Sequence, residues 1–440
     1  MHTRTHADLL NPRYVEWVDF LRASEDWTAD RIASHQLSEL QRAVRSAYMS
    51  TSGYRSLFDS AGVRPEALDR LDDIRAIPTV EKEMIRDRLV DFTVPGSNRQ
   101  YVTTGGSTGI PFGFFRDESA FAKELASKAY QYYRIGWREG DAQLVFRGLP
   151  IATEDHVRYY PEFNELRCSS YHLTPEWMEV FRTKAWEFRP KWIRCYPSSG
   201  YIFAKWLKTS GRAFPPIQGL LCASENLYDY QRELLREIFH ARVFSHYGHY
   251  ELAVLAGFCE TEDTYHVLPQ YGYAELLDPR GQPVVRPGEV GEIVGTSFVM
   301  TATPFVRYRT RDYARLAGFG CPSCGRPYQI WDRIEGRLQE FIVTNTGRWI
   351  SMTAINFHDD IFDHIQQFQF HQFEKGLVTF RYIPRESCGA SEVAEMCTRL
   401  SAKLGSDISL RMQPVAEIPP TDRGKHRFLI QELRLEFGDA

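Results

Sequence analysis

A run of small and hydroxylated residues, TTGGSTGIPFGFF, occupies Thr103–Phe115. Its hydroxyl groups can donate hydrogen bonds, and its glycines allow successive backbone N–H groups to point toward one centre. Such a concave set of donors suits the oxygen atoms of a phosphate. The run lacks the Gly-Lys-Ser/Thr of a Walker loop and the spacing of a dinucleotide-binding motif. The residues alone leave two interpretations equally open, a phosphate-binding loop and a flexible connection between two elements.

A second group of residues has the chemistry of a metal site. Cys321 and Cys324 form a Cys-x-x-Cys motif within CPSCG, which supplies two thiolates on one tight turn. Cys259 and His266, close together upstream, would complete a Cys3His set. The alternatives are a redox-active cysteine pair and four unrelated residues. Because four protein ligands leave no open coordination position, we expect a structural Zn²⁺ and not a catalytic one.

The composition is typical of a soluble globular protein. The chain has 440 residues, of which 43% are hydrophobic and 25% charged, and its formal net charge is -4. This length predicts two or three units of roughly 100–200 residues each. The charge gives no support for nucleic acid as a partner, and no run of about 18 apolar residues predicts a membrane span. Without a signal-peptide pattern, we expect a cytoplasmic protein with its scattered cysteines reduced.

The order of the expected elements predicts an α/β fold. Apolar residues recur three and four apart through much of residues 1–95, which predicts a helical lead-in. Short apolar strands then alternate with helices, a pattern that favours parallel α/β sheets with ligands at the carboxyl ends of the strands. Turn signals at 279–281 and 287–288 predict a small barrel-like section. We place a domain boundary near Leu338, before a unit of mixed strands and helix.

Several segments, in sequence order, resemble motifs of the adenylate-forming enzymes, a superfamily that includes acyl- and aryl-CoA synthetases, the adenylation domains of nonribosomal peptide synthetases and luciferase. These enzymes join a carboxylate to AMP and release pyrophosphate. The matching segments are TTGGSTGIP (103–111), CASEN (222–226), HYGHYE (246–251), RYRTRD (307–312), RIEGR (333–337) and DRGKHRF (422–428). Each match is weak by itself, but their common order over more than 300 residues makes the resemblance specific.

Three further features narrow the resemblance to one branch. The segments AIPTVEKEMIRDRL and RCYPSSGYIFAKWL, together with the cysteine pattern, resemble the phenylacetate–CoA ligase and capsule-biosynthesis (CapK) branch over nearly the whole chain. The segment VTNTGRWIS is more similar to the capsule-type members than to the CoA ligases. The resemblance implies an N-terminal domain over 1–338, with a zinc-clasped section at about 255–330, and a small mobile α+β domain over 339–440 that carries the catalytic lysine.

The resemblance also implies a nucleotide site for ATP with Mg²⁺. Tyr247 would lie against the adenine, Asp312 would accept hydrogen bonds from both ribose hydroxyls, and the glycine run would hold the β- and γ-phosphates. The full set of expected nucleotide-binding residues is Thr103, Thr104, Gly105, Gly106, Ser107, Thr108, Gly109, Ser224, Glu225, His246, Tyr247, Gly248, Asp312 and Arg337. Without the motifs, surface ion pairs would explain the charged members of this set.

The expected catalytic residues are Lys425, Glu251 and Arg337. The resemblance implies that the Lys425 ammonium bridges carboxylate and phosphate, that Glu251 is a magnesium ligand, and that Arg337 meets phosphate or ribose. A solvated surface lysine and a helix-terminal carboxylate are the alternatives for the first two. The expected acid-binding residues are Tyr196, Ser198, Tyr201 and His246, for which simple core packing is the alternative.

The sequence departs from the family motifs at two positions. Arg311 stands where the glycine before the aspartate is usual, and Gln339 stands where the hinge aspartate is usual. We expect an ATP-dependent ligase that adenylates a small, aromatic or planar carboxylic acid and passes the acyl group to CoA, a carrier-protein thiol or an amine. The rival hypothesis is a nucleotide-binding or assembly protein that has lost the chemistry. Monomer and homodimer are both compatible with the sequence.

Overall fold

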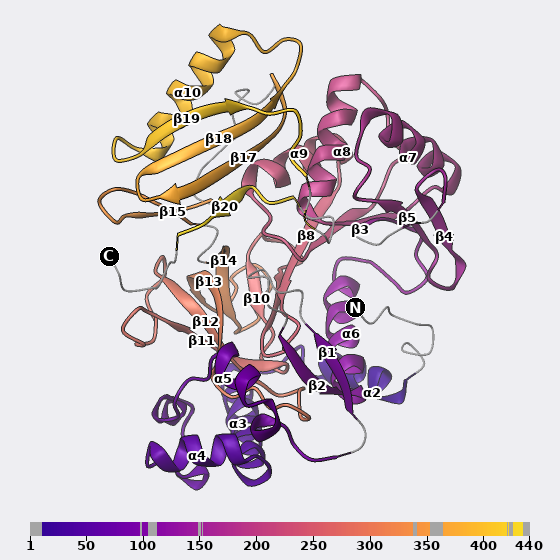
Figure 1. Ribbon diagram of the computed structural model, residues 1–440. Helices are drawn as coiled ribbons and strands as arrows, with labels where there is room; N and C mark the ends of the chain where they lie inside the picture. The colour runs from indigo at the N-terminus through magenta and orange to yellow at the C-terminus, as the bar shows by residue number, and fades with distance from the viewer. Residues whose placement is uncertain are drawn as a thin grey trace. The chain divides into compact units, whose positions relative to one another are not determined.

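The computed structural model describes residues 11–96, 99–103, 112–147, 151, 153–337, 341–352, 364–419, 421 and 426–433 (Figure 1). The chain forms two compact units, each built from two separate stretches. Unit 1 comprises Met1–Glu139 and His246–Arg333, and unit 2 comprises Gly140–Ser245 and Ile334–Ala440. Each unit therefore combines an early part of the chain with a late one.

Helices dominate the early part of unit 1. The side chain of Thr28 accepts a hydrogen bond from the Arg31 amide and caps the longest of them, whose inner face buries Leu40, Val44 and Ala47. The helices of this unit are α2 (Pro12–Ala23), α3 (Ala29–Ser50), α4 (Ser52–Ser60), α5 (Lys82–Asp87) and α6 (Glu118–Tyr133), with 3-10 turns η1 (Pro65–Ala67), η2 (Leu71–Ala76) and η3 (Leu89–Phe92).

Two groups of strands complete unit 1. Strands β1 (Arg99–Thr103) and β2 (Gly113–Asp117) pair antiparallel, with Thr103 opposite Gly113. The larger group has the strand order β11-β12-β13-β14-β10-β9-β8. Its members are β8 (Arg242–Gly248), which begins in unit 2, β9 (Leu255–Phe258), β10 (Tyr265–Val267), β11 (Gly272–Leu277), β12 (Val290–Ser297), β13 (Tyr308–Phe319) and β14 (Gln329–Arg337).

The early part of unit 2 is a mostly parallel sheet with the order β7-β6-β3-β5-β4. Only β4 pairs antiparallel to its neighbour. Phe181, Phe203 and Leu235, from the three helices of this part, belong to one buried cluster with apolar strand residues. The elements are β3 (Gln143–Arg147), β4 (Val157–Tyr160), η4 (Pro161–Phe163), β5 (Glu165–Ser169), α7 (Pro175–Phe188), β6 (Trp192–Cys195), α8 (Pro197–Ser210), β7 (Gly219–Ala223) and α9 (Asp229–Phe239).

The described residues of the late part of unit 2 form a four-stranded sheet, with the order β19-β18-β17-β20, and a separate two-stranded sheet, β15-β16. Helix α10 lies against the larger sheet (Figure 1). Its residues Met396, Leu400 and Leu404 belong to the same buried cluster as apolar residues of that sheet. The elements are β15 (Phe341–Val343), β16 (Trp349–Ser351), β17 (Ile365–Glu374), β18 (Leu377–Pro384), α10 (Ala390–Leu404), β19 (Ser409–Pro414) and β20 (Leu429–Gln431).

The predicted α/β class with parallel strands and an α+β C-terminal part is confirmed. The barrel-like detail is not, because the antiparallel strands after Tyr271 form an open row and no closed barrel occurs among the described residues. The expected boundary residue, Leu338, lies outside the described residues, so the division into 1–338 and 339–440 stays a prediction. No helix in the described ranges combines the length and apolar character needed to cross a bilayer.

Candidate active site and metal centre

Unit 1 brings Tyr247 and Asp312 together. Tyr247 lies near the end of β8, and Asp312 lies in β13, 65 residues later. The Tyr247 hydroxyl donates a hydrogen bond to Asp312 Oδ2 at 2.9 Å. The Asp312 amide donates to Thr310 Oγ1 at 3.1 Å, which fixes the local backbone. A phenol and a carboxylate from two of the matching segments therefore lie side by side.

Glu251 lies in the turn after β8, and its carboxylate is buried. The Tyr308 hydroxyl donates to Oε1 at 2.9 Å, and His249 Nδ1 lies 3.2 Å from Oε2. Burial by itself would raise the pKa of Glu251, but the interaction with His249, with smaller contributions from its own backbone amide and from Tyr308, lowers the pKa to about 2. The carboxylate is thus ionised at neutral pH, as a hard-metal ligand must be.

His246 and Gly248 flank Tyr247 in the same strand. The His246 Nδ1 atom lies 3.0 Å from the hydroxyl of Tyr132 in α6, and the two rings meet edge to face with centroids 5.8 Å apart. Gly248 packs against Leu255 of the neighbouring strand β9. The end of β8 is therefore held between a helix and a strand of unit 1.

Arg311 adopts a backbone conformation that favours glycine. Its φ is +60°, in the left-handed region that non-glycine residues rarely occupy. Its amide donates to Glu292 Oε1 at 3.1 Å, and its guanidinium donates to Glu83 at 2.8 Å and to Glu81 at 3.2 Å. Arg311 thus stands before Asp312 in a left-handed conformation. Three carboxylates, those of Glu81, Glu83 and Glu292, surround it.

Unit 2 holds the other described candidates at the carboxyl ends of β6 and β7. Ser224 follows β7 with φ at +71°, and the carboxylate of Glu225 accepts a hydrogen bond from the Ser198 amide in the first turn of α8 at 3.0 Å. Tyr196 and Ser198 are buried. The Tyr201 ring instead packs edge-on against Tyr230 at 5.2 Å, beside the core of the C-terminal sheet.

The remaining predicted site residues lie largely outside the described residues. Thr103 ends β1, and Gly113 opposite it has no room for a side chain, because a Cβ there would lie 1.8 Å from Tyr101 Oη. Strand β14 reaches Arg337, whose side chain is outside the description. Also outside are Thr104, Gly105, Gly106, Ser107, Thr108, Gly109, Gln339 and Lys425.

The structure assembles the predicted Cys3His set in unit 1. One ligand atom from each of Cys259, His266, Cys321 and Cys324 lies within 4.8 Å of the others. Cys259 Sγ is 4.0 Å from Cys321 Sγ, and Cys324 Sγ is 3.9 Å from His266 Nδ1. Two sulfurs on one tetrahedral zinc lie about 3.7 Å apart, given Zn–S bonds of about 2.3 Å. The donor set and its spacing therefore fit a zinc ion.

The surroundings of this cluster offset the charge of bound thiolates. A Zn²⁺ ion with three thiolates and a neutral histidine carries a net charge of -1. Glu260 lies between Arg326, with which it forms an ion pair, and Arg134, whose Nη1 is 3.6 Å from Glu260 Oε2. Burial lowers the pKa of His266 to about 4, so its imidazole is neutral at pH 7 and has a lone pair for a metal.

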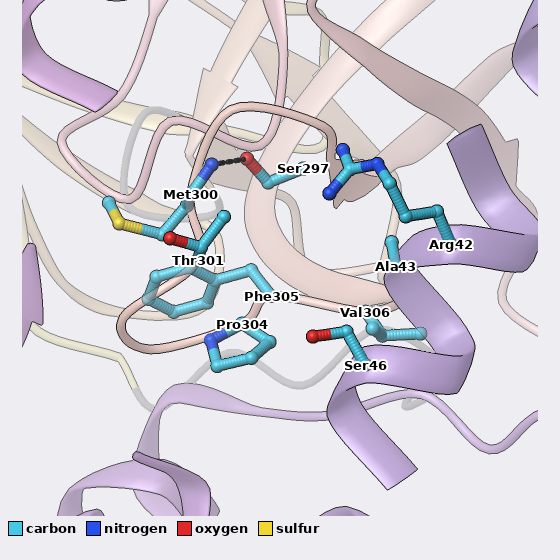
Figure 2. A pocket seen from close by; sticks show the side chains of 9 residues that line it. All are labelled: Arg42, Ala43, Ser46, Ser297, Met300, Thr301, Pro304, Phe305 and Val306. Atoms are coloured by element: carbon cyan, nitrogen blue, oxygen red, sulfur yellow. Dashed lines mark hydrogen bonds between the residues drawn. The ribbon is translucent and has the colours of Figure 1, made fainter. Parts of the chain in front are cut away.

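A surface pocket lies away from these residues, between α3 and the chain from Ser297 to Val306. Figure 2 shows its lining residues, with the Met300 amide donating to Ser297 Oγ at 3.0 Å. Its empty volume is ≈ 280 Å³ even with space open to solvent included, which is below the roughly 300–1,000 Å³ of small-molecule sites. It contains none of the candidate residues, so it is not the nucleotide site.

Sequence reasoning missed two residues that contact Glu251. His249 lies inside the HYGHYE segment and Tyr308 inside RYRTRD, so both were within the quoted motifs. Neither has a chemical signature in the sequence, because their role depends on a turn and on a strand that starts 57 residues after Glu251. Only the three-dimensional pairing of the two motifs reveals them.

Comparisons with known proteins agree with this architecture. No family model matches the chain. It is 26% identical to the phenylacetate–coenzyme A ligase of Pseudomonas putida over 329 residues, which cover 72% of this chain and 73% of that protein. It is 23% identical to protein CapK of Staphylococcus aureus over 449 residues, which cover 97% and 89%.

A solved structure of 2-hydroxyisobutyryl-CoA ligase in the postadenylation state is also similar. The TM-score is 0.72 at 19% identity, and the alignment covers 92% of this chain and 90% of that one. The predicted resemblance to the adenylate-forming enzymes, in the branch of the phenylacetate–CoA ligases and CapK, is therefore confirmed.

Proposed function

We propose that the chain is an ATP-dependent, AMP-forming ligase that adenylates a small, aromatic carboxylic acid. The observation that carries the proposal is a pair of hydrogen bonds between the segments 246–251 and 307–312. Tyr247 donates to Asp312, and Tyr308 donates to Glu251, each at 2.9 Å. Together they join the two segments in one unit, which supports roles for Tyr247, Asp312 and Glu251 in a common site.

In the first half-reaction a carboxylate oxygen of the acid attacks the α-phosphorus of ATP. The bond from that phosphorus to the bridging oxygen breaks, which gives acyl-AMP and pyrophosphate. Such a reaction depends on positioning and charge neutralisation. Tyr247 would stack on the adenine, Asp312 would bind the ribose hydroxyls, and residues 103–109 would hold the departing phosphates.

The proposed site uses magnesium and two cationic side chains. Glu251 fits Mg²⁺, since its carboxylate is ionised and carboxylate oxygens are ligands that Mg²⁺ prefers. The metal would supply charge neutralisation at the phosphates when bound. Lys425 would contact both the attacking carboxylate and the α-phosphate, and Arg337 would bind phosphate or ribose.

In the second half-reaction a nucleophile attacks the acyl carbon and AMP leaves. A thiol acceptor forms a thioester and releases one proton, and an amine forms an amide. Two of the three relatives reported above are named as CoA ligases, which supports CoA as the first acceptor to test. A carrier-protein thiol and an amine are the other two acceptors to test. Tyr196, Ser198, Tyr201 and His246 are the proposed acid-binding residues.

We also propose a structural Zn²⁺ ion at Cys259, His266, Cys321 and Cys324. The cluster takes four ligands from two segments of unit 1. It would tie the β9–β10 hairpin to the turn before β14. With no open coordination position, it has no part in the chemistry.

ATP–pyrophosphate exchange with a panel of aryl and aliphatic acids tests the ligase. We expect exchange with at least one acid, and none with any acid would favour the rival nucleotide-binding or assembly protein. Lys425→Ala should reduce exchange by at least about 10²-fold, while Lys375→Ala, at an exposed turn lysine, should not. Exchange unchanged in Lys425→Ala would remove that residue from the mechanism without removing the activity. CoA, a phosphopantetheinyl carrier protein and amines, supplied one at a time, then identify the acceptor.

A further inference from the structure

The carboxylate of Glu251 is held at both of its oxygen atoms. Tyr308 donates to Oε1 at 2.9 Å, and His249 Nδ1 lies 3.2 Å from Oε2. The side chains of His249 and Glu251 are 7% and 12% exposed, so little water competes for these bonds. A carboxylate has about four lone-pair positions. That number exceeds the contacts of the carboxylate with Tyr308, His249 and its own backbone amide.

The second nitrogen of His249 determines which way its proton points. The backbone amide of Val254 donates to His249 Nε2 at 3.2 Å. A backbone N–H can only donate, so Nε2 must carry the lone pair. In a neutral imidazole the proton then resides on Nδ1, where it is donated to Glu251 Oε2.

The rings around His249 fix its orientation as well. Its ring stacks near that of Tyr308, with centroids 6.3 Å apart and planes at 26°, and Tyr247 lies 6.0 Å away on a tilt. Leu252, whose φ is +56°, donates its amide to the His249 carbonyl at 3.1 Å and closes the turn between His249 and Val254. The histidine is therefore held by its ring faces, its backbone and both nitrogens.

We propose that His249 is a positioning residue for Glu251, and that its Nδ1–H orients the carboxylate toward the magnesium of bound MgATP. This inference rests on the proposed adenylation function. The ligands of a metal depend on such outer hydrogen bonds for their orientation, and loss of one commonly costs 10–100-fold in metal affinity. His249 itself contacts neither metal nor nucleotide in this proposal.

Two substitutions separate the two hydrogen bonds of His249. In His249→Gln the amide oxygen can replace Nε2 as acceptor for Val254, but the donor to Glu251 is lost. In His249→Asn the amide nitrogen can replace Nδ1 as donor to Glu251, but the acceptor for Val254 is lost. A merely structural imidazole would make the two variants similarly defective, or would favour Gln, which keeps the bond within the turn.

The readout is binding of α,β-methylene-ATP, which cannot be cleaved at the α–β position, to the full chain by calorimetry in saturating Mg²⁺ and in EDTA. The ratio of the two affinities measures the contribution of the metal. We expect His249→Gln to reduce this ratio about tenfold or more and His249→Asn to stay within about threefold of the parent. The kcat of ATP–pyrophosphate exchange by the His249→Gln variant should fall at low Mg²⁺ and recover at high Mg²⁺.

Each other outcome decides against the proposal. An unchanged ratio in His249→Gln, or an equal loss in both variants, would overturn the positioning role and leave the ligase proposal intact. A parent protein that binds the analogue equally well with and without Mg²⁺ would overturn the magnesium role of Glu251 together with that of His249. Thermal unfolding of each variant confirms that a folded protein is compared.

Discussion

The hydroxyl of Tyr247 donates a hydrogen bond to Asp312 Oδ2 across 2.9 Å. The two residues come from strands β8 and β13, which are not neighbours in the strand order of unit 1. The aspartate side chain is therefore oriented by a contact between two strands that are far apart in the sequence. A side chain set in advance binds with less loss of rotamer freedom.

This pairing predicts different effects for the two residues on ATP binding. Asp312→Asn should raise the KM for ATP by roughly 10–100-fold, because hydrogen bonds to a charged group contribute about 1.5–3 kcal/mol. Tyr247→Phe keeps the ring and loses only the orienting bond, so the KM should rise less, by about 2–10-fold. Exchange kinetics measure both. A larger effect for Tyr247→Phe than for Asp312→Asn would contradict the assignment.

Much of the fold follows from local patterns in the sequence. The alternation of apolar strands with helices between Gln143 and Phe239 predicts a parallel sheet, and the structure has one. The barrel-like interpretation failed because turn signals identify antiparallel strands but do not say whether the first and last strands meet. In the structure β14 pairs with β10 and not with β11. That pairing depends on contacts far apart in the chain, which no local pattern encodes.

Individual residues of the candidate site were predicted only where they belong to a recognisable sequence motif. Tyr247, Glu251 and Asp312 were identified from family resemblance, and the structure brings them into one unit. The cysteines were identified from spacing and ligand chemistry, and they cluster. The hydrogen bonds from His249 and Tyr308 to Glu251 were not predicted. In the sequence, a histidine or tyrosine that donates to a carboxylate cannot be told from one that only packs in the core.

Arg311 makes a testable exception to the family pattern. Its left-handed φ costs about 1–2 kcal/mol relative to glycine, while exposed ion pairs such as those with Glu81 and Glu83 contribute about 0–1 kcal/mol each. Arg311→Gly should therefore change the free energy of unfolding by less than about 1 kcal/mol. Arg311→Ala keeps the strain and loses the pairs, so it should be the less stable variant by about 1 kcal/mol. Urea unfolding of both compares them, and equal stabilities would argue against the strain.

The metal centre predicts one zinc per chain by elemental analysis. Cys324→Ser should abolish the stoichiometric zinc and lower the Tm by roughly 5 °C or more, since each kcal/mol shifts the Tm of a domain of this size by about 2–4 °C. Cys388→Ser, at a half-buried cysteine outside the cluster, is the matched control and should retain the metal. Zinc retained in Cys324→Ser would mean that the metal lies elsewhere.

The depressed pKa of Glu251 makes a prediction about acid stability. A carboxyl whose pKa is lowered on folding, here from 4.5 to about 2, stabilises the folded state fully above pH 4.5. That contribution, about 3 kcal/mol, is lost progressively as the pH falls from 4.5 toward 2. Glu251→Gln removes the titrating group but can still accept from Tyr308. The difference in unfolding free energy between the parent and Glu251→Gln should therefore shrink steadily between pH 5 and pH 3. Denaturant titration at each pH measures this difference. A difference independent of pH would show that the folded state does not hold Glu251 in the ionised form.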